Sequence, residues 1–367
     1  MKKANIMKMI PMIILILTMT ACDKEEKKVI IEEEPGKTIT VIENKEQEEE
    51  SKPNVTADRI VVFDKVINIT DWLDENTVLV SKENTTLDKM SLAELSETYP
   101  RSLYLLDLNT MEYKLLKEEK DVYLDGAVLS ADRKYLLYSL NTLGDPSFYM
   151  MNMETSEAFG IMGDPIGAAM TAKWADSDTI IGVAYSGGAY LADRTGEITP
   201  VEELKEEALY LLEKIGDTIF YNTVYDPTLM KLDLNTGEKV KLPLEQVYEM
   251  HPSPDGKQLL LLQADGAKSI LTVYDLASKE KATIAEGAEI RGVSWSPDQR
   301  RIAYHLKEEG NNTSKGSLYV YDMLTGEANW IIVGNESFFT SWSPSGTRLI
   351  FTEWTGTQNS SSIIYLK

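Results

Sequence analysis

Side chains that commonly carry out catalysis are scarce in this 367-residue chain, which has two histidines and one cysteine. A zinc site usually draws on several His or Cys ligands, and a Ser-His-Asp hydrolase would have to use His251 or His305. His251 precedes a proline where a strand meets a turn, and His305 follows apolar residues on a strand, so we expect structural roles for both. The sequence therefore predicts no catalytic residue, no metal ligand and no cofactor.

Glycine motifs do not change this picture. Gly187 and Gly188 predict a tight connection and not a phosphate-binding loop, because neither a helical pattern nor a Lys follows them. The chain has no Gly-x-Ser-x-Gly elbow of the kind that α/β-hydrolase peptidases use. The informative patterns are those that build the scaffold.

A short block recurs along the chain. It reads Trp-Ser-Pro-Asp at residues 295–298, Trp-Ser-Pro-Ser-Gly at residues 342–346 and Pro-Ser-Pro-Asp-Gly at residues 252–256, and an apolar run follows each copy. Because Pro, Asp and Gly reverse the chain after a strand, each block predicts a hairpin of two antiparallel strands. The Trp position recurs at Trp72, Leu129, Trp174, Leu212, Pro252, Trp295 and Trp342. These spacings bracket the roughly 40–50 residues of a four-stranded propeller blade.

A second turn signal closes each unit. It is centred on an acid or amide at Asp107, Asn152, Asp193, Asp233, Asp275 and Asp322. We expect these side chains to accept hydrogen bonds from backbone amides of the turn and not to act in catalysis. The four Trp residues in register are expected to pack between sheets, whereas Trp330 and Trp354, outside the register, are expected to be exposed.

The predicted fold is therefore all-β, a β-propeller of about seven four-stranded blades. Six blades is the alternative, if the degenerate unit at residues 212–221 merges with a neighbour. The last unit has three strands before the chain ends, and residues 59–66 read as the missing fourth strand. An N-terminal strand would then complete the last blade and leave no open edge.

The amino terminus predicts export. Met1-Lys2-Lys3 is followed by an apolar run too short to span a bilayer, and Cys22 follows small residues. This region resembles a bacterial lipoprotein signal, in which a lipobox, here residues 19–22, ends in the Cys that is acylated; the alternative is an ordinary signal with an incidental Cys. We expect a signal peptide at residues 1–21, an acidic disordered tether at 22–57 and the propeller domain at 58–367. Transient strands at residues 30–31 and 38–42 are a minor alternative within the tether.

The formal net charge of −22 opposes nucleic-acid binding, which needs clustered Lys and Arg. It also opposes flat docking on anionic lipids, so membrane attachment is expected through the N-terminal lipid. With Cys22 acylated, no thiol remains for a disulfide.

Residues 292–298, 302–304 and 318–322 resemble the repeat of the TolB-type propellers, relatives of the WD-repeat proteins. The resemblance implies an extracytoplasmic propeller used mainly for protein contacts, and it weakens over residues 168–242. TolB itself has a folded α/β segment before its propeller, and this chain has an acidic segment there, so envelope partners do not carry over. The axial His and Gln cluster of propeller lyases is not apparent.

Uneven loops suggest where a ligand binds, since a repeat scaffold does not require them. Long loops are expected at residues 81–101, 141–146, 307–315 and 355–361, and they would meet on one arc of one face. Residues 91–94 match a capping box and predict a short helix in the first loop. The candidate ligand-binding residues are Leu92, Glu94, Tyr99, Arg101, Asn141, Asp145, Asn311, Asn312, Trp354 and Gln358.

These expectations define a monomeric, lipid-anchored, extracytoplasmic propeller on a bacterial membrane that binds a protein or a cell-envelope ligand. The alternative is an enzyme, a polysaccharide lyase or glycosidase with acids in an axial pocket. A third hypothesis is a solute-binding lipoprotein. A rim of aromatic and polar loop residues around a plugged axis would favour the binder, and clustered acids with raised pKa values facing the axis would favour the enzyme.

Overall fold

The computed structural model describes residues 28–32, 38–43, 55–63, 68–308, 310, 315–335, 337–354 and 359–367. Strands dominate this part of the chain, and its helical elements are two single turns of 3-10 helix, η1 (Ala93–Leu95) and η2 (Glu202–Leu204). None of the helices in these ranges is long and apolar enough to cross a bilayer. Cys22 and the predicted signal lie outside the described residues.

Four consecutive antiparallel sheets have four strands each and occupy residues 173–335. The first consists of β14 (Lys173–Trp174), β15 (Thr179–Val183), β16 (Ala189–Asp193) and β17 (Ile198–Val201). The second consists of β18 (Leu209–Ile215), β19 (Thr218–Thr223), β20 (Met230–Asp233) and β21 (Lys239–Lys241). The third consists of β22 (Val247–Pro252), β23 (Gln258–Asp265), β24 (Lys268–Asp275) and β25 (Lys281–Gly287). The fourth consists of β26 (Glu289–Trp295), β27 (Arg301–Lys307), β28 (Gly316–Asp322) and β29 (Glu327–Asn335).

Residues 68–160 form two further four-stranded groups. The first contains β4 (Asn68–Asp74), β5 (Thr77–Glu83), β6 (Arg101–Asp107) and β7 (Tyr113–Lys117). The second contains β8 (Tyr123–Leu129), β9 (Tyr135–Asn141), β10 (Ser147–Asn152) and β11 (Ala158–Gly160). One parallel pair, Arg101 with Tyr123, joins the groups into a single sheet. A small hairpin of β12 (Met162–Gly163) and β13 (Gly167–Ala168) follows.

The last sheet joins the two ends of the described chain. Its strands are β30 (Ser337–Trp342), β31 (Arg348–Trp354), β32 (Asn359–Leu366), β3 (Ala57–Phe63), β2 (Thr38–Glu43) and β1 (Lys28–Glu32), in that spatial order. β3 pairs antiparallel with β32, with Ala57 opposite Leu366. β3 covers most of the strand predicted at residues 59–66. β1 and β2 fall within the segment predicted as a tether, at the two places where the sequence left transient strands as an alternative.

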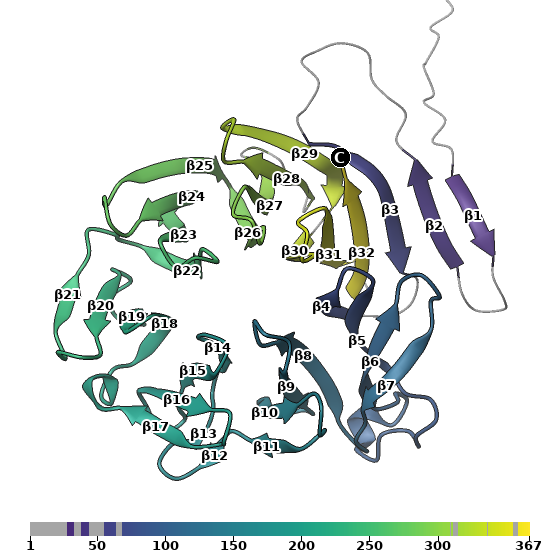
Figure 1. Cartoon of the computed structure of the whole chain (residues 1–367), viewed down its shortest axis with the longest axis horizontal. Helices are drawn as coiled ribbons and strands as arrows, with labels where there is room; N and C mark the ends of the chain where they lie inside the picture. Colours follow the sequence, from purple (N-terminus) through teal and green to yellow (C-terminus); the bar gives the residue numbers. More distant parts are fainter. Residues whose placement is uncertain are drawn as a thin grey trace, which may run out of the picture.

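The sheets lie side by side around a common centre, with β4, β8, β14, β18, β22, β26 and β30 innermost (Figure 1). Six of these innermost strands shift register against their neighbours, which indicates a β-bulge: β4, β8, β18, β22, β26 and β30. Such bulges bend a strand and increase its twist. All-β composition, four-stranded antiparallel sheets and this radial arrangement are those of a β-propeller. The unit near residues 212–221 has a sheet of its own.

The hydrophobic core lies between neighbouring sheets, and four tryptophans tie the innermost strands together. Trp72, Trp295 and Trp342 are buried. Each donates its indole N–H to a backbone carbonyl on the innermost strand of the preceding sheet, a contact that we call an indole bond. The carbonyls belong to Ser341, His251 and Ser294, at 3.1, 3.2 and 3.4 Å respectively. The half-buried Trp174 makes the same bond to Val128, at 2.9 Å. The predicted packing between sheets is confirmed.

The repeated turn residues also act as predicted. In the Ser-Pro-Asp turn, the Ser296 hydroxyl donates to Asp298 at 2.6 Å and accepts the amide of Arg301 at 2.8 Å. In the second turn type, the Asp233 carboxylate accepts the amides of Asn235 and Thr236 at 2.9 and 3.0 Å. Equivalent bonds occur at Asp107, Asn152, Asp275 and Asp322. These Asp side chains and Asn152 stabilise turns.

Candidate functional site

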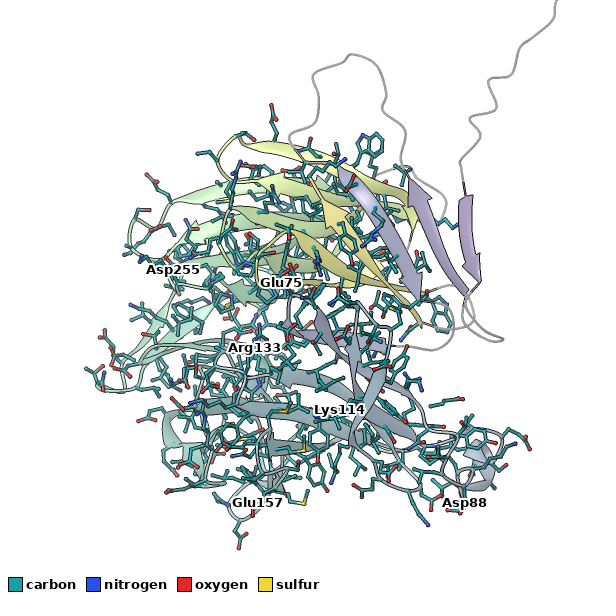
Figure 2. The ribbon with its side chains drawn as sticks, turned by 45° about the vertical axis from the view of Figure 1, so that its right-hand side comes forward. Glu75, Asp88, Lys114, Arg133, Glu157 and Asp255 are labelled. Atoms are coloured by element: carbon teal, nitrogen blue, oxygen red, sulfur yellow. The ribbon has the colours of Figure 1, made fainter. Side chains whose placement is uncertain are left out.

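Strand alternation gives the ring two faces. The turns between the first and second strands of each sheet, and those between the third and fourth strands, lie on one face, the turn face, where Figure 2 labels Glu75, Arg133 and Asp255. The loops between the second and third strands, together with the connections between sheets, lie on the opposite face, the loop face. The longest of these loops, residues 84–100, contains Asp88 and projects at the edge of the molecule (Figure 2).

This longest loop packs onto the connection that leads into β8. It contains η1, whose N-cap is Leu92, and no side chain caps the helix. The capping box predicted at residues 91–94 is wrong. In such a box the Ser91 backbone amide would donate to Glu94, but here it donates to the Asp121 carboxylate at 2.5 Å. Leu92 and Glu94 are exposed on the outside of the loop.

Two candidate residues meet around Tyr123, the first residue of β8. The Tyr123 carbonyl accepts a hydrogen bond from the side-chain amide of Asn141 at 3.4 Å, and the Tyr123 hydroxyl lies 2.5 Å from that of Thr98. The Arg101 backbone amide donates to the Val122 carbonyl at 3.1 Å, and its guanidinium donates to the Ser81 carbonyl at 2.7 Å. Arg101 and Asn141 thus hold the loop against its neighbours, and Tyr99 beside them is half-buried.

The remaining candidates lie apart. Asp145 is exposed and bonds the hydroxyl of Tyr185 on the next sheet, which raises the pKa of that tyrosine. Trp354 ends β31 and is 47% exposed, and Trp330 is 54% exposed, so the predicted exposure of both is confirmed. Asn311, Asn312 and Gln358 lie outside the described residues.

A set of large apolar side chains is exposed on a different part of the loop face. We call it the apolar arc, and it consists of Leu143, Met170, Tyr185, Tyr210, Val224 and Tyr225. Exposed fractions reach 54% at Tyr210, 59% at Val224 and 88% at Tyr225. The arc spans three consecutive four-stranded groups, from the β9–β10 loop through the β15–β16 loop to the β19–β20 loop.

Backbone contacts place the segments that carry the arc next to one another. The Tyr185 amide donates to the Ala168 carbonyl at 2.9 Å, which holds the β15–β16 loop against the segment that carries Met170. Gly188, in the same loop, lies so close to Leu204 that an added Cβ would meet its carbonyl at 2.8 Å. The Val224 amide donates to the Ala208 carbonyl at 2.9 Å, which extends the surface to the β19–β20 loop.

Exposed apolar surface of this extent is informative. Single exposed apolar side chains are normal, but a contiguous group marks an interaction surface. Tyrosines suit this role because they bring a large apolar area and a polar tip at low entropic cost. Most of this set lies outside the loops whose length was predicted to mark a site, and Leu143 lies within one of them, at residues 141–146. The weakening of the repeat over residues 168–242 was the available signal for the others.

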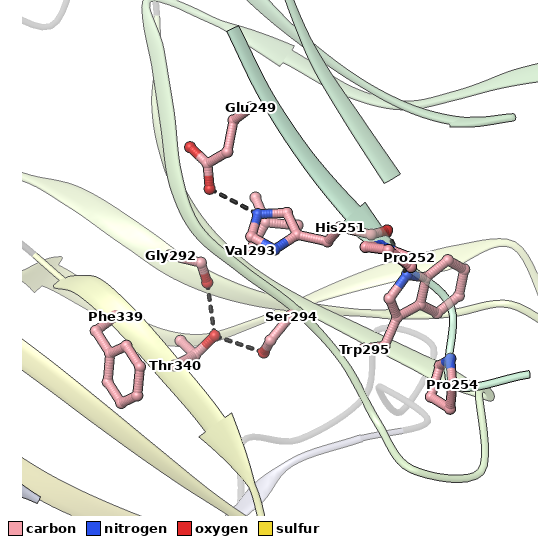
Figure 3. Close-up of a pocket in the computed structure, with 10 residues that line it drawn as sticks. All are labelled: Glu249, His251, Pro252, Pro254, Gly292, Val293, Ser294, Trp295, Phe339 and Thr340. Atoms are coloured by element: carbon pink, nitrogen blue, oxygen red, sulfur yellow. Dashed lines mark hydrogen bonds and ion pairs between the residues drawn. The ribbon is translucent and has the colours of Figure 1, made fainter. Parts of the chain in front are cut away.

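A recess of about 450 Å³ opens between β22, β26 and β30, the innermost strands of three neighbouring sheets. The His251 ring lies in it and bonds the Glu249 carboxylate at 2.7 Å (Figure 3). On the opposite wall, the Thr340 hydroxyl donates to the Gly292 carbonyl and contacts the Ser294 hydroxyl, both at 2.6 Å. His251 therefore faces the centre of the ring, whereas His305 is buried within its sheet.

Carboxylates on the innermost strands each have a partner. Glu213 pairs with Lys173 and Glu289 pairs with Arg291. The Asp125 carboxylate accepts a hydrogen bond from the side-chain amide of Asn68 at 2.8 Å. In the described ranges, no group of three or more His, Cys, Asp or Glu side chains could hold a metal ion.

A second recess, about 420 Å³, lies on the turn face beside Arg133, Lys134 and Arg194. Its charges are already compensated. Arg194 pairs with Asp132 at 2.8 Å and with Asp178 at 3.0 Å, and its guanidinium lies over the Tyr135 ring. We assign no site to it.

Comparison with known proteins bears on the fold. No family model matches the chain, and no curated protein matches it by sequence. Two solved oligogalacturonate lyases align at 15% identity: one in complex with manganese, with a TM-score of 0.62 over 93% of this chain and 96% of the other, and one from Vibrio parahaemolyticus, with a TM-score of 0.64 over 89% and 97%. The β-propeller domain of Cps50 (Swd1) from Myceliophteria thermophila aligns with a TM-score of 0.55 at 13% identity, over 83% and 98%. TolB from Acinetobacter baumannii aligns with a TM-score of 0.46 at 16% identity, over 79% and 80%.

Proposed function

We propose that this β-propeller is a lipid-anchored, extracytoplasmic binding protein that captures a protein or cell-envelope ligand on its loop face. The observation that carries the proposal is the apolar arc, in which Tyr210, Val224 and Tyr225 expose more than half of their surface. Folding alone does not require these side chains, so their exposure points to a partner. We propose that the protein acts as a monomer.

The scaffold under this proposal is a closed ring of seven blades. Seven four-stranded groups support the count, namely β4–β7, β8–β11, β14–β17, β18–β21, β22–β25, β26–β29 and β30–β32 with β3. Closure is supported by the pairing of β3 with β32 and by the indole bond from Trp72 to Ser341. A closed ring leaves only short, protected sheet edges and holds its loops in fixed positions.

Attachment to the membrane would occur through Cys22. Changing Cys22→Ser should release the protein into soluble fractions or leave an uncleaved precursor, because no acyl chain can be added. Fractionation and gel mobility would be compared with those of the parent. A Cys22→Ser variant that fractionates and migrates like the parent would exclude lipid attachment.

The binding face is tested with a triple variant, Tyr210→Ser, Val224→Ser and Tyr225→Ser. Partner capture from intact membranes, measured by crosslinking, should be lost, since hot spots of this kind carry about 2 kcal/mol or more each. The matched control is Leu324→Ser with Trp330→Ser, two exposed side chains outside the arc. Equal loss of capture in both variants, or in neither, would remove the arc as the binding face.

The second candidate function is that of a polysaccharide lyase or glycosidase. The recess at the centre of the ring favours it, because a histidine and a carboxylate, His251 and Glu249, face open space there at 2.7 Å from each other. The fold is also that of oligogalacturonate lyases. Incubation with oligogalacturonates would test this function: product release that depends on His251 and is unaffected by the arc variant would favour the enzyme.

A further inference from the structure

The surroundings of the apolar arc are acidic. Asp145 lies two residues after Leu143, and Glu206 lies two residues before Ala208, whose carbonyl accepts the Val224 amide. Glu245 follows Leu244, whose carbonyl accepts the amide of Leu229 in the loop that holds Tyr225. All three carboxylates are on exposed residues.

These carboxylates are not neutralised. Of the described acids that border the arc, Glu207 pairs with Lys239 and Asp226 pairs with Lys241, each at 2.8 Å. The structure shows no ion pair for Asp145, Glu206 or Glu245 among the described residues. Lys205 is exposed and lies 3.9 Å from Glu202, a surface pair of little energetic value.

We propose that the partner of the apolar arc is a basic amphipathic segment of a polypeptide, with apolar side chains flanked by Lys or Arg. This inference rests on the proposed function, since it concerns the same face. Apolar side chains of the partner would cover Tyr210, Val224 and Tyr225, and its cations would lie over the bordering carboxylates. Charge complementarity of this kind speeds encounter and excludes acidic competitors. An anionic lipid surface would be repelled by the same carboxylates and by a net charge of −22.

Synthetic peptides can test the partner's chemistry directly. We would use three fluorescent 18-residue helical peptides with one apolar pattern of Leu, their polar positions filled with Lys, Gln or Glu. Anisotropy with the full chain carrying Cys22→Ser should show the Lys peptide binding roughly tenfold tighter than the Gln peptide near 50 mM salt. The difference should shrink near 300 mM salt, because screening weakens exposed charges.

Two variants separate this inference from the proposed function. The triple variant Asp145→Asn, Glu206→Gln and Glu245→Gln should bind the Lys peptide severalfold more weakly than the parent does. The affinity of this variant should also depend less on salt concentration. Its matched control removes three exposed acids from the turn face, Glu112→Gln, Glu154→Gln and Glu157→Gln, with the same change in net charge. The control should bind like the parent.

Each outcome bears on one of the two proposals. Equal weakening by the control, or equal affinity for the Lys and Gln peptides, would overturn the basic partner and leave the binding face intact. Unchanged peptide affinity after Tyr210→Ser, Val224→Ser and Tyr225→Ser would overturn the face itself. Binding to phosphatidylcholine vesicles that matches peptide binding would identify the arc as a lipid-contacting surface and also overturn the inference.

Discussion

Two regions of the ring differ in how their sheets are joined. From β22–β25 through β26–β29 and the last sheet to β4–β7, three consecutive indole bonds connect each innermost strand to the next. From β8–β11 to β18–β21, Trp174 makes one such bond, and the apolar arc occupies the loop face. The first region follows the repeat closely, and in its described loops between second and third strands Leu92 is the exposed large apolar side chain, while Trp330 and Val333 are exposed on β29. The second departs from the repeat and presents the side chains of the arc to solvent.

This difference indicates the structural role of the repeated residues. Its Trp, Ser and Asp residues join sheets and close turns, so they specify the scaffold and leave little freedom at the surface. Where these residues are replaced, the sheets still form, because alternating apolar residues suffice to pair and pack strands. Under the proposed function, departure from the repeat marks the part of the propeller that binds.

Removing β3, the strand that joins the two ends of the described chain within the first region, should have the largest effect. Deleting residues 55–63 removes the buried side chains of Val55 and Phe63 and leaves β32 unpaired along one edge. Burial of each such side chain is worth about 1.5–3 kcal/mol, and whole domains have only about 5–15 kcal/mol. We expect loss of cooperative thermal unfolding. Deleting residues 28–43 removes only the outer hairpin and should shift Tm slightly; equal melting of the two deletions would contradict closure.

Two tyrosines in the second region separate folding from binding. Tyr221 on β19 is buried, and Tyr225 in the loop that follows is 88% exposed. Tyr221→Ser should lower the free energy of unfolding by about 3–5 kcal/mol, because it leaves a large cavity. Tyr225→Ser should change it by less than about 0.5 kcal/mol. Urea titration of both variants is the measurement, and a comparable loss at Tyr225 would assign the arc to folding.

The indole bonds are expected to contribute unequally. Trp72→Phe and Trp342→Phe remove the indole bonds to the carbonyls of Ser341 and Ser294 together with part of a buried ring, at a cost of about 1–3 kcal/mol each. Trp174→Phe should cost less, since Trp174 is only half-buried. Chemical denaturation would rank the three. A Trp174→Phe variant as destabilised as Trp72→Phe would remove the distinction between the two regions.

The smallest predicted effect concerns two acids with opposite pH dependence. Burial raises the pKa of Asp71 above 3.8, although its carboxylate accepts the amides of Leu129 and Trp72. Its contribution to stability should therefore grow as the pH falls toward 3.8. Bonds from Lys241 and Thr228 lower the pKa of Asp226 to about 2. Its contribution is present above pH 3.8 and should be lost as the pH falls toward 2.

Unfolding measured against pH would check these signs. Asp71→Asn should remove the gain on the acid side, and Asp226→Asn should remove the loss at still lower pH. The same direction of change in both variants would show that local burial does not govern these two groups.

The sequence predicted the scaffold well because its determinants are local. Ser253, Ser296 and Asp233 bond amides only a few residues away, so the turn chemistry is visible in a short window. The pairing of β3 with β32 followed from counting strands. The outer hairpin of β1 and β2 was weighed only as a minor alternative, because a Glu-rich segment with few aromatic residues is typical of disorder.

The candidate site was harder to predict, because it depends on side-chain direction. Tyr221 on β19 is buried, and Tyr225 in the loop that follows is exposed. Because both residues are tyrosines, residue type does not distinguish them. Loop length was a weak guide: Arg101 and Asn141, at the ends of long loops, bond backbone carbonyls of Ser81 and Tyr123. His251 faces a recess whose walls come from β22, β26 and β30, three strands far apart in the chain, so a short sequence window does not reveal it.

The pairing of β3 with β32 also determines when the last sheet can form. Ala57 pairs with Leu366, so nearly the whole chain must be available before these strands meet. Contacts between residues far apart in sequence form slowly, because closing a long loop costs entropy. Sheets such as β22–β25 consist of consecutive hairpins and can form from local segments alone. A chain that emerges from its amino terminus would therefore assemble sheet after sheet, and β3 would remain without its partner until β32 is available.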